Sequence, residues 1–149
     1  MSLKFLTPKN TLDFYTPEDS APLEIVLAQT GISAGFPSPA DDFKEFKISL
    51  DKTLVKNKEA TFYAKVSGQS MVGAGIDDGD LLVVDKSLEP QHNSIAVCFI
   101  DGEFTVKRLK ISGGDVYLQP ENPAYNPIKI TESNDFQVWG IVTHVIKKL

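Results

Sequence analysis

One serine and one lysine are the residues of this chain best suited to peptide chemistry. Ser70 lies in a glycine-containing bend, VSGQSM at residues 66–71, directly after an apolar run. A serine hydroxyl is a weak nucleophile until a neighbouring base takes its proton. Neither a histidine nor a carboxylate stands in an obvious position for that role, whereas Lys107 lies on a predicted strand. The residue types therefore favour a Ser70/Lys107 dyad as a working hypothesis.

Lys107 can act as a base only if its surroundings remove its proton at neutral pH. The ordinary pKa of lysine is about 10.4, and burial lowers it by roughly 3 to 5 units because a desolvated ammonium is penalised. On an alternating strand Lys107 shares one face with Thr105, Leu109 and Ile111. This face is partly apolar, and Thr105 offers a hydroxyl that can orient the amine. The alternative stays open, since strand lysines are usually solvated and serines beside glycine usually only shape a turn.

Other catalytic arrangements fit the sequence less well. His92 follows a proline in a loop and His144 lies among apolar residues of the last predicted strand, so both are interpreted as structural. The carboxylates of Asp77, Asp78 and Asp80 are typical of turns and surfaces. The chain lacks the Cys/His spacing of a metal site, so we expect neither a metal nor a cofactor.

Length and composition indicate one globular domain with an extension. The chain has 149 residues, of which 42% are hydrophobic and 23% charged, as is ordinary for a soluble protein. Its net charge of −5 argues against a dedicated DNA-binding protein. The single cysteine, Cys98, lies inside an apolar run and is expected to pack in the core. No apolar run reaches the roughly 20 residues of a membrane span, and we expect a cytoplasmic protein without a signal peptide.

From residue 61 onward the pattern predicts a mainly β, antiparallel fold. Short apolar or alternating runs are separated by turn residues, and Asp101-Gly102 indicates a tight hairpin. Ser49 is a candidate N-cap for a short helix that ends near Leu54. The predicted strands are Thr61–Val66, Leu81–Val84, Ile95–Ile100, Phe104–Ile111, Val116–Gln119, Ile128–Ile130 and Phe136–Ile146.

The first 38 residues or so differ from the rest and are interpreted as a flexible N-terminal arm. Prolines divide them into short polar pieces, and only residues 23–28 suggest a strand or a single helical turn. The arm is too broken for a helix-turn-helix, which needs two uninterrupted helices. Residues 30–37 are small and bounded by proline, so they suit an extended segment in an active site.

Several stretches resemble the LexA/UmuD family of self-cleaving serine peptidases. They are residues 67–71 (SGQSM), 78–85 (DGDLLVVD) and 101–109 (DGEFTVKRL), and the spacing of 37 residues between Ser70 and Lys107 also fits. The match extends to residues 34–40, 122–128 and 139–146, and covers about residues 34–149. Within the family the chain is similar to UmuD, because the FPSPAD run after Gly35 is UmuD-like and the arm leaves no room for a repressor's DNA-binding domain.

The resemblance implies a fold and a set of site residues. The fold would be LexA/signal-peptidase-like, with coiled antiparallel sheets. Ser70 would be the nucleophile and Lys107 the general base, with Thr105 orienting the lysine. The backbone N–H groups of Gln69 and Ser70 would form the oxyanion hole. The cleaved bond would be Ala34-Gly35, which divides the chain into a removable arm (1–34) and a peptidase and dimerisation domain (35–149).

The resemblance also implies partners. Cleavage would occur on an activated recombinase filament of the RecA type, assembled on single-stranded DNA during the SOS response. The processed homodimer would serve a UmuC-type translesion DNA polymerase, without a membrane and without sequence-specific DNA binding of its own. Two alternatives remain: a non-catalytic dimeric interaction module, and a fragment of a LexA-like repressor. The region upstream of Ala34 shares little with the family, so the docking of the arm is not implied.

Overall fold

A computed structural model of the chain describes residues 12–18, 24–28 and 45–149. The chain forms two compact units. One contains residues 1–17 and 57–149, and the other contains residues 18–56. Each unit is described by itself below.

The smaller unit is a two-stranded antiparallel ribbon followed by a short helix. Strand β2 (Glu24–Ala28) pairs with β3 (Glu45–Ser49), and α2 (Leu50–Leu54) follows at once. The Ser49 side chain accepts a hydrogen bond from the Lys52 N–H at 3.5 Å, which confirms Ser49 as the N-cap. Of the two possibilities for residues 23–28, the strand is correct. Strand β3 was not predicted, because the polar residues before it hide the alternation.

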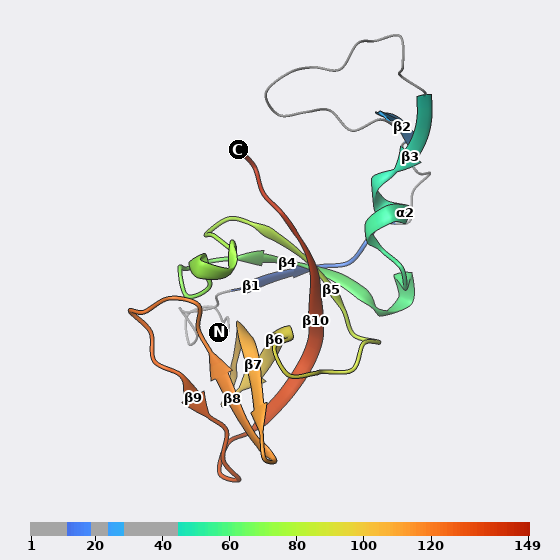
Figure 1. Cartoon of the computed structure of the whole chain (residues 1–149). Helices are drawn as coiled ribbons and strands as arrows, with labels where there is room; N and C mark the ends of the chain where they lie inside the picture. Colours follow the sequence, from blue (N-terminus) through green and yellow to red (C-terminus); the bar gives the residue numbers. More distant parts are fainter. Residues whose placement is uncertain (1–11, 19–23, 29–44) are drawn as a thin grey trace, which may run out of the picture. The chain divides into compact units, whose positions relative to one another are not determined.

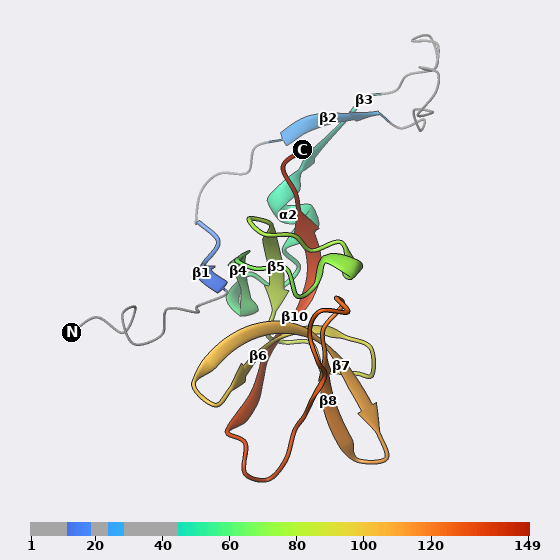
Figure 2. The ribbon, with the colours of Figure 1, turned by 90° about the vertical axis from the view of Figure 1, so that its left-hand side faces the viewer.

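In the larger unit, the described residues form one eight-stranded, curled antiparallel sheet (Figures 1 and 2). The strand order is β1-β4-β5-β10-β6-β7-β8-β9. The mainly β, coiled antiparallel prediction is therefore confirmed. The strands are β1 (Leu12–Tyr15), β4 (Thr61–Val66), β5 (Leu81–Asp85), β6 (Ile95–Ile100), β7 (Glu103–Ser112), β8 (Asp115–Gln119), β9 (Ile128–Lys129) and β10 (Phe136–Ile146), and the short 3₁₀ turns are η2 (Lys58–Ala60) and η3 (Val72–Ala74).

Strand β10 joins the two halves of this sheet. Its residues 136–141 pair with β6 and its residues 141–146 pair with β5, so the strand runs from one half into the other (Figure 1). The register shifts on either side of Gly140 and Ile141, as expected where a strand bends. A Cβ atom at Gly140 would lie 2.7 Å from the Val84 Cγ1 atom, which explains why glycine interrupts this apolar strand.

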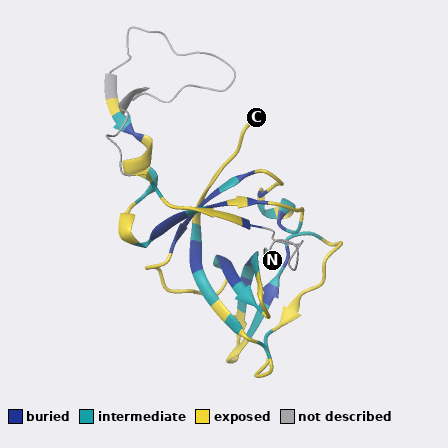
Figure 3. Cartoon of the chain, turned by 180° about the vertical axis from the view of Figure 1, so that it is seen from behind, coloured by how far each residue is buried: buried dark blue, intermediate teal, exposed yellow. Residues whose placement is uncertain are grey.

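Two clusters of buried side chains form the core, and buried residues gather on the strands while the loops are exposed (Figure 3). Alternation along β7 supplies both clusters, since Val106 belongs to the first and Leu109 to the second. Cys98 is fully buried in the second cluster, and burial raises the pKa of its thiol to about 12. Core packing of Cys98 is therefore confirmed, and its thiol stays protonated.

The predicted strands of the β-rich region all form, with ends that differ by at most one residue. One strand in the arm was missed: β1 at residues 12–15 pairs with β4 at the edge of the sheet. Its four residues are too few for alternation to stand out from a proline-rich background. No helix among the described residues is long and apolar enough to cross a membrane.

The close approach at Gly140 leads to a stability prediction. Gly140→Ala should lower the free energy of unfolding by about 1 to 3 kcal/mol, because the added methyl group overlaps Val84 and the backbone of Asp85. Urea titration followed by circular dichroism measures the change. Gln137→Ala, at an exposed position of the same strand, is the matched control and should stay within about 0.5 kcal/mol of the parent. Equal stability of the two variants would contradict the packing described here.

Candidate active site

Lys107 lies on β7, an inner strand of the sheet whose neighbours are β6 and β8. Its partner across the β6 pairing is Ala96, a fully buried residue. The lysine itself is 9% exposed, which is rare for this residue type. The expected partly apolar surroundings of Lys107 are present, since Leu109 on the same face of β7 is also buried. A charged ammonium at this position has lost most of its hydration.

Three oxygen atoms surround the Lys107 amine. Its Nζ atom lies 2.9 Å from the Ser70 Oγ atom, 2.6 Å from the Thr105 Oγ1 atom and 3.0 Å from the Val106 carbonyl oxygen. Two hydroxyls and a carbonyl are neutral groups. Among the described residues no carboxylate pairs with this amine. The folded chain therefore brings Ser70, Lys107 and Thr105 together, from positions 37 and 2 residues apart in the sequence.

These surroundings shift the titration of Lys107. Burial lowers the pKa of the Lys107 amine from 10.5 to about 8, and only a weak interaction with Cys98 opposes the shift. At pH 7 about one amine in ten would then be neutral, compared with about one in 3,000 at the ordinary pKa. A neutral amine has two N–H donors and one lone pair. These three groups suit the three neighbours. The two N–H groups can donate to the Val106 carbonyl and the Thr105 hydroxyl, and the lone pair can accept from the Ser70 hydroxyl.

The loop that carries Ser70, residues 67–80, is closed on itself at its base. The Val66 N–H donates to the Asp80 carbonyl at 2.9 Å, and the Gly79 N–H donates to the Val66 carbonyl at 2.8 Å. Gly68 has a φ of 105°, a conformation that favours glycine, and its N–H donates to the Asp78 Oδ1 atom at 2.8 Å. The bend before Ser70 is thus held by backbone and carboxylate contacts rather than by the serine.

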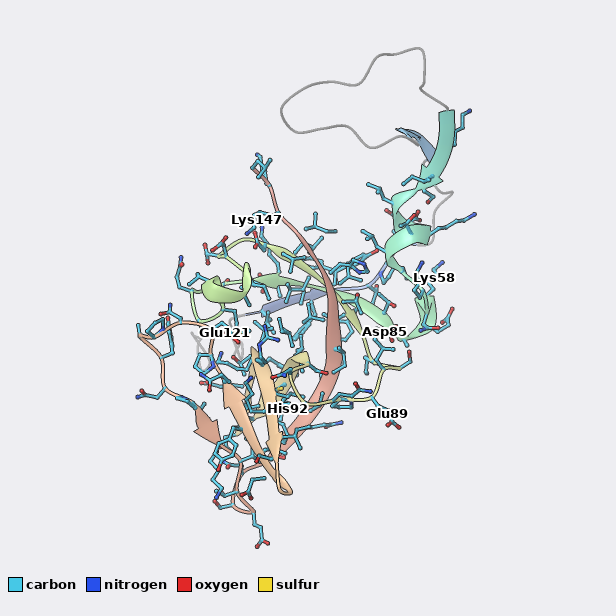
Figure 4. The ribbon with its side chains drawn as sticks, in the orientation of Figure 1. Lys58, Asp85, Glu89, His92, Glu121 and Lys147 are labelled. Atoms are coloured by element: carbon cyan, nitrogen blue, oxygen red, sulfur yellow. The ribbon has the colours of Figure 1, made fainter. Side chains whose placement is uncertain are left out.

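A second loop, after β8, holds the Ser70 loop from outside. The Glu121 N–H donates to the Ser70 carbonyl at 2.9 Å, and the Glu121 carbonyl accepts from the Gly73 N–H at 2.7 Å. Figure 4 shows Glu121 beside the turn that contains η3. Arg108, on β7, pairs with the Glu121 carboxylate at 2.5 Å. The strand that carries Lys107 is therefore connected to the loop that positions Ser70.

Asn122 adds a contact that orients the peptide unit just before Ser70. Its Nδ2 atom donates to the Gln69 carbonyl at 2.8 Å. In a trans peptide the carbonyl and the next N–H point in opposite directions, so this bond also sets the direction of the Ser70 N–H. Among the described residues, nothing accepts a hydrogen bond from the N–H of Gln69 or of Ser70. Within the described part of the chain, both predicted oxyanion-hole donors are therefore unpaired.

The C-terminal strand holds the far end of the Ser70 loop. Lys147, which follows β10 (Figure 4), pairs with Asp77 at 2.6 Å and also with Asp80. Burial raises the pKa of the Asp80 carboxyl, but the hydrogen bonds from Lys147 and the Asp77 N–H, together with the charge of Lys147, outweigh burial, so this pKa lies below its ordinary value. Asp80 is a turn carboxylate as predicted, since its Oδ2 atom accepts the Asp77 N–H at 2.8 Å, but the surface part of the prediction was wrong, since the residue is 5% exposed.

The remaining sequence predictions have different outcomes. Ala34 and Gly35, the predicted cleavage site, lie outside the described residues. His92 is structural as expected, because its Nδ1 atom accepts the Ile111 N–H at 2.9 Å. No three His, Cys, Asp or Glu side chains within the described ranges gather as metal ligands. Glu121 and Asn122 were missed as site residues, although the proline- and asparagine-rich loop that contains them was visible in the sequence.

Comparison of this chain with known proteins identifies its family. The model of the peptidase S24-like family matches residues 26–143. Protein ImpA of Salmonella typhimurium is 43% identical, over 77% of this chain and 78% of its own length. Protein MucA of Escherichia coli is 44% identical, over 76% and 77%. The LexA repressor of Syntrophotalea carbinolica is 37% identical, over 84% of this chain and 60% of the repressor.

The family match covers most of the chain and contains Ser70, Lys107 and Thr105. The relatives include both ImpA- and MucA-type proteins and a LexA repressor, in agreement with the resemblance seen in the sequence. This chain belongs to the peptidase S24-like family of self-cleaving serine peptidases, as a UmuD-like member of the LexA/UmuD group.

Proposed function

We propose that this chain is a serine peptidase that cuts its own Ala34-Gly35 bond with a Ser70/Lys107 dyad. One observation carries the proposal. The buried Lys107 amine lies 2.9 Å from the Ser70 Oγ atom and has only neutral oxygen neighbours among the described residues. A lysine with a purely structural role would be expected to pair with a carboxylate. Burial without such a partner favours the neutral amine, which is the form that a general base requires.

The first chemical step forms an acyl-enzyme. Neutral Lys107 takes the hydroxyl proton of Ser70 as the Oγ atom attacks the Ala34 carbonyl carbon. The developing oxyanion accepts hydrogen bonds from the N–H groups of Gln69 and Ser70. The bond to the Gly35 nitrogen then breaks, and the Lys107 ammonium returns the proton to the leaving amine. Residues 1–34 remain as an ester on Ser70.

The second step restores the dyad. Lys107, neutral again, takes a proton from a water molecule that attacks the ester. The Lys107 ammonium returns this proton to the Ser70 Oγ atom as the ester bond breaks, and residues 1–34 leave as a carboxylic acid that ionises in solution. Thr105 positions the amine throughout, since its Oγ1 atom lies 2.6 Å from Nζ. Gly35 suits the cleaved position, because a residue without a side chain lets the backbone approach Ser70 closely.

Membership of the family supports a wider role. We propose that docking on an activated RecA-type filament on single-stranded DNA triggers cleavage as part of the cytoplasmic SOS response. A filament that binds the cleavable arrangement better than the resting one accelerates the reaction without rebuilding the site. The processed form, residues 35–149, would act as a homodimer and as an accessory subunit of a UmuC-type translesion polymerase. Sequence-specific binding of duplex DNA would instead support a repressor role.

The pH dependence of self-cleavage tests the base. The rate should rise about tenfold per pH unit below pH 8 and level off above it, because the neutral fraction of Lys107 follows its pKa of about 8. Mass spectrometry of the purified chain, incubated from pH 6 to 10.5, measures the appearance of a product that begins at Gly35. Ser70→Ala and Lys107→Ala should abolish this product, whereas His144→Ala, at an exposed position, should leave it unchanged. A pH-independent rate would contradict lysine as the base.

Replacing Lys107 should also stabilise the fold, in a pH-dependent manner. Below pH 8 the lysine is charged in both the folded and the unfolded chain, so the folded state carries the full penalty of burial. Between pH 8 and 10.5 the unfolded chain binds more protons, and the penalty fades as the pH rises. Lys107→Met should therefore raise the free energy of unfolding by about 1 to 3 kcal/mol at pH 7, and by less at pH 10.

Urea titrations at the two pH values measure this difference. Lys148→Met, at an exposed position after β10, is the control and should change the free energy by less than about 0.5 kcal/mol at pH 7. If Lys107→Met is instead less stable than the parent at pH 7, the lysine supports the fold. That result would contradict a buried base that destabilises the folded state.

Asn122 offers a test of the oxyanion geometry. Asn122→Asp keeps the side-chain oxygen that accepts the Ala124 N–H at 2.9 Å but loses the Nδ2 donor to the Gln69 carbonyl. Because that donor orients the Ser70 N–H, self-cleavage should slow about 10- to 100-fold, and Asn122→Ala should slow it similarly. Circular dichroism checks that the fold is kept. A parental rate in Asn122→Asp would show that the donor does not position the peptide.

A further inference from the structure

Strand β1 lies at the edge of the sheet, although it belongs to the arm. It pairs antiparallel with β4, with Leu12 opposite Val66, Asp13 opposite Lys65 and Phe14 opposite Ala64. In the strand order β1 is outermost, and β4 would be the edge without it. Between β1 and the rest of this unit the chain passes through residues 18–56. That connection contains the bond between residues 34 and 35.

Two side chains of β1, Leu12 and Phe14, contact residues of the neighbouring strands, although Phe14 stays partly exposed. Leu12 is 2% exposed and belongs to the first core cluster. The Phe14 ring contacts three other rings, with centroids 5.5 Å from Phe62, 4.9 Å from Phe104 and 5.7 Å from Trp139. The geometry is edge-on for Phe62 and Phe104, as aromatic pairs prefer.

Two further features mark the β1 edge: a pair of opposite charges across β1 and β4, and a groove beside the end of β1. Asp13 lies directly opposite Lys65, a favourable cross-strand pair. A groove of about 680 Å³ continues from the end of β1, with Lys86 placed over the Trp139 ring at 4.8 Å. The groove is lined by Phe14, Tyr15, Thr16, Glu59, Ala60, Thr61, Phe62, Lys86 and Trp139. An extended peptide longer than β1 could therefore be accommodated.

We propose that the β4 edge is a strand-docking site, which β1 occupies in the uncut chain. After cleavage β1 dissociates, and an extended segment of a partner protein binds in its place. The partner would supply an extended segment with the pattern of β1: an aliphatic residue, an acid and two aromatics. Main-chain pairing with an exposed edge supplies affinity, and pockets for alternate side chains supply specificity. The transfer step rests on the proposed self-cleavage, whereas the docking site itself does not.

Covalent attachment is what keeps such a short strand in place. A tethered segment experiences an effective concentration on the order of millimolar, about a thousandfold above a free peptide at micromolar concentration. After the bond between residues 34 and 35 breaks, β1 is attached to the β4 unit by this pairing alone. A four-residue strand then leaves, and β4 presents unpaired backbone groups to solution.

The test uses an added protease to cut the chain, so that the cut does not depend on the proposed self-cleavage. A Ser70→Ala chain receives the recognition sequence of a site-specific protease after Ser20, so that an added protease detaches β1. A labelled synthetic peptide with residues 9–18 of this chain serves as the probe, and fluorescence anisotropy measures its binding. Trp139, the single tryptophan of the chain, reports whether Phe14 still covers it.

After cutting, the N-terminal fragment should elute separately in gel filtration at micromolar protein, and acrylamide quenching of Trp139 should at least double. The probe should bind the cut protein at least tenfold more tightly than the uncut protein. A control peptide with Leu12→Ser and Phe14→Ser should bind at least tenfold more weakly than the probe. As a second variant that needs no cut, the intact chain with Leu12→Ser and Phe14→Ser should also take up the probe.

Two results would overturn the docking site. One is a fragment that stays bound after cutting, with unchanged quenching of Trp139. The other is a cut protein that dimerises and ignores the probe, which would make a second copy the occupant. If the wild-type chain fails to cleave itself while the cut protein binds the probe, the proposed self-cleavage is contradicted and the docking site is supported.

Discussion

The buried amine of Lys107 is the feature on which the rest of the site depends. It is surrounded by two hydroxyls and a carbonyl, and burial lowers its pKa to about 8. A carboxylate at hydrogen-bonding distance would hold the ammonium charged and would remove it as a base. In the proposed mechanism, the burial of Lys107 opposes folding at neutral pH, and the same burial makes the amine a better base. Such conflicts between stability and chemistry are typical of active sites.

The surrounding structure holds Ser70 against this amine from several directions. The Ser70 loop is closed at its base by β4 and the Asp80 turn, held from outside by Glu121 and Asn122, and tied to the C-terminal segment by Lys147. These contacts join residues far apart in the chain. Catalysis that relies on positioning requires supports of this kind, since a displacement of about 1 Å can cost about a hundredfold in rate. If the proposed self-cleavage uses this arrangement, the step open to control is the delivery of the substrate bond to Ser70.

Much of this was predictable from the sequence. Alternation and turn residues located the strands from Thr61 onward, and the family pattern pointed to Ser70, Lys107 and Thr105 before any geometry was known. Two features were not predictable. Strand β1 is short and forms because Leu12 and Phe14 find partners contributed by distant strands. Asn122 acts through a single side-chain bond to a residue 53 positions away, which no local pattern encodes.

The proposed mechanism depends most directly on the proton affinity of the Lys107 amine. Carbon-13 labelling of the lysine side chains in a Ser70→Ala chain allows the Lys107 Cε resonance to be followed by NMR as the pH is raised, and Lys107→Met assigns the resonance. We expect a midpoint at a pKa of about 8. A midpoint near the ordinary lysine value of about 10.4 would contradict it, because Lys107 would then be charged at the pH of the cell and unable to take the Ser70 proton.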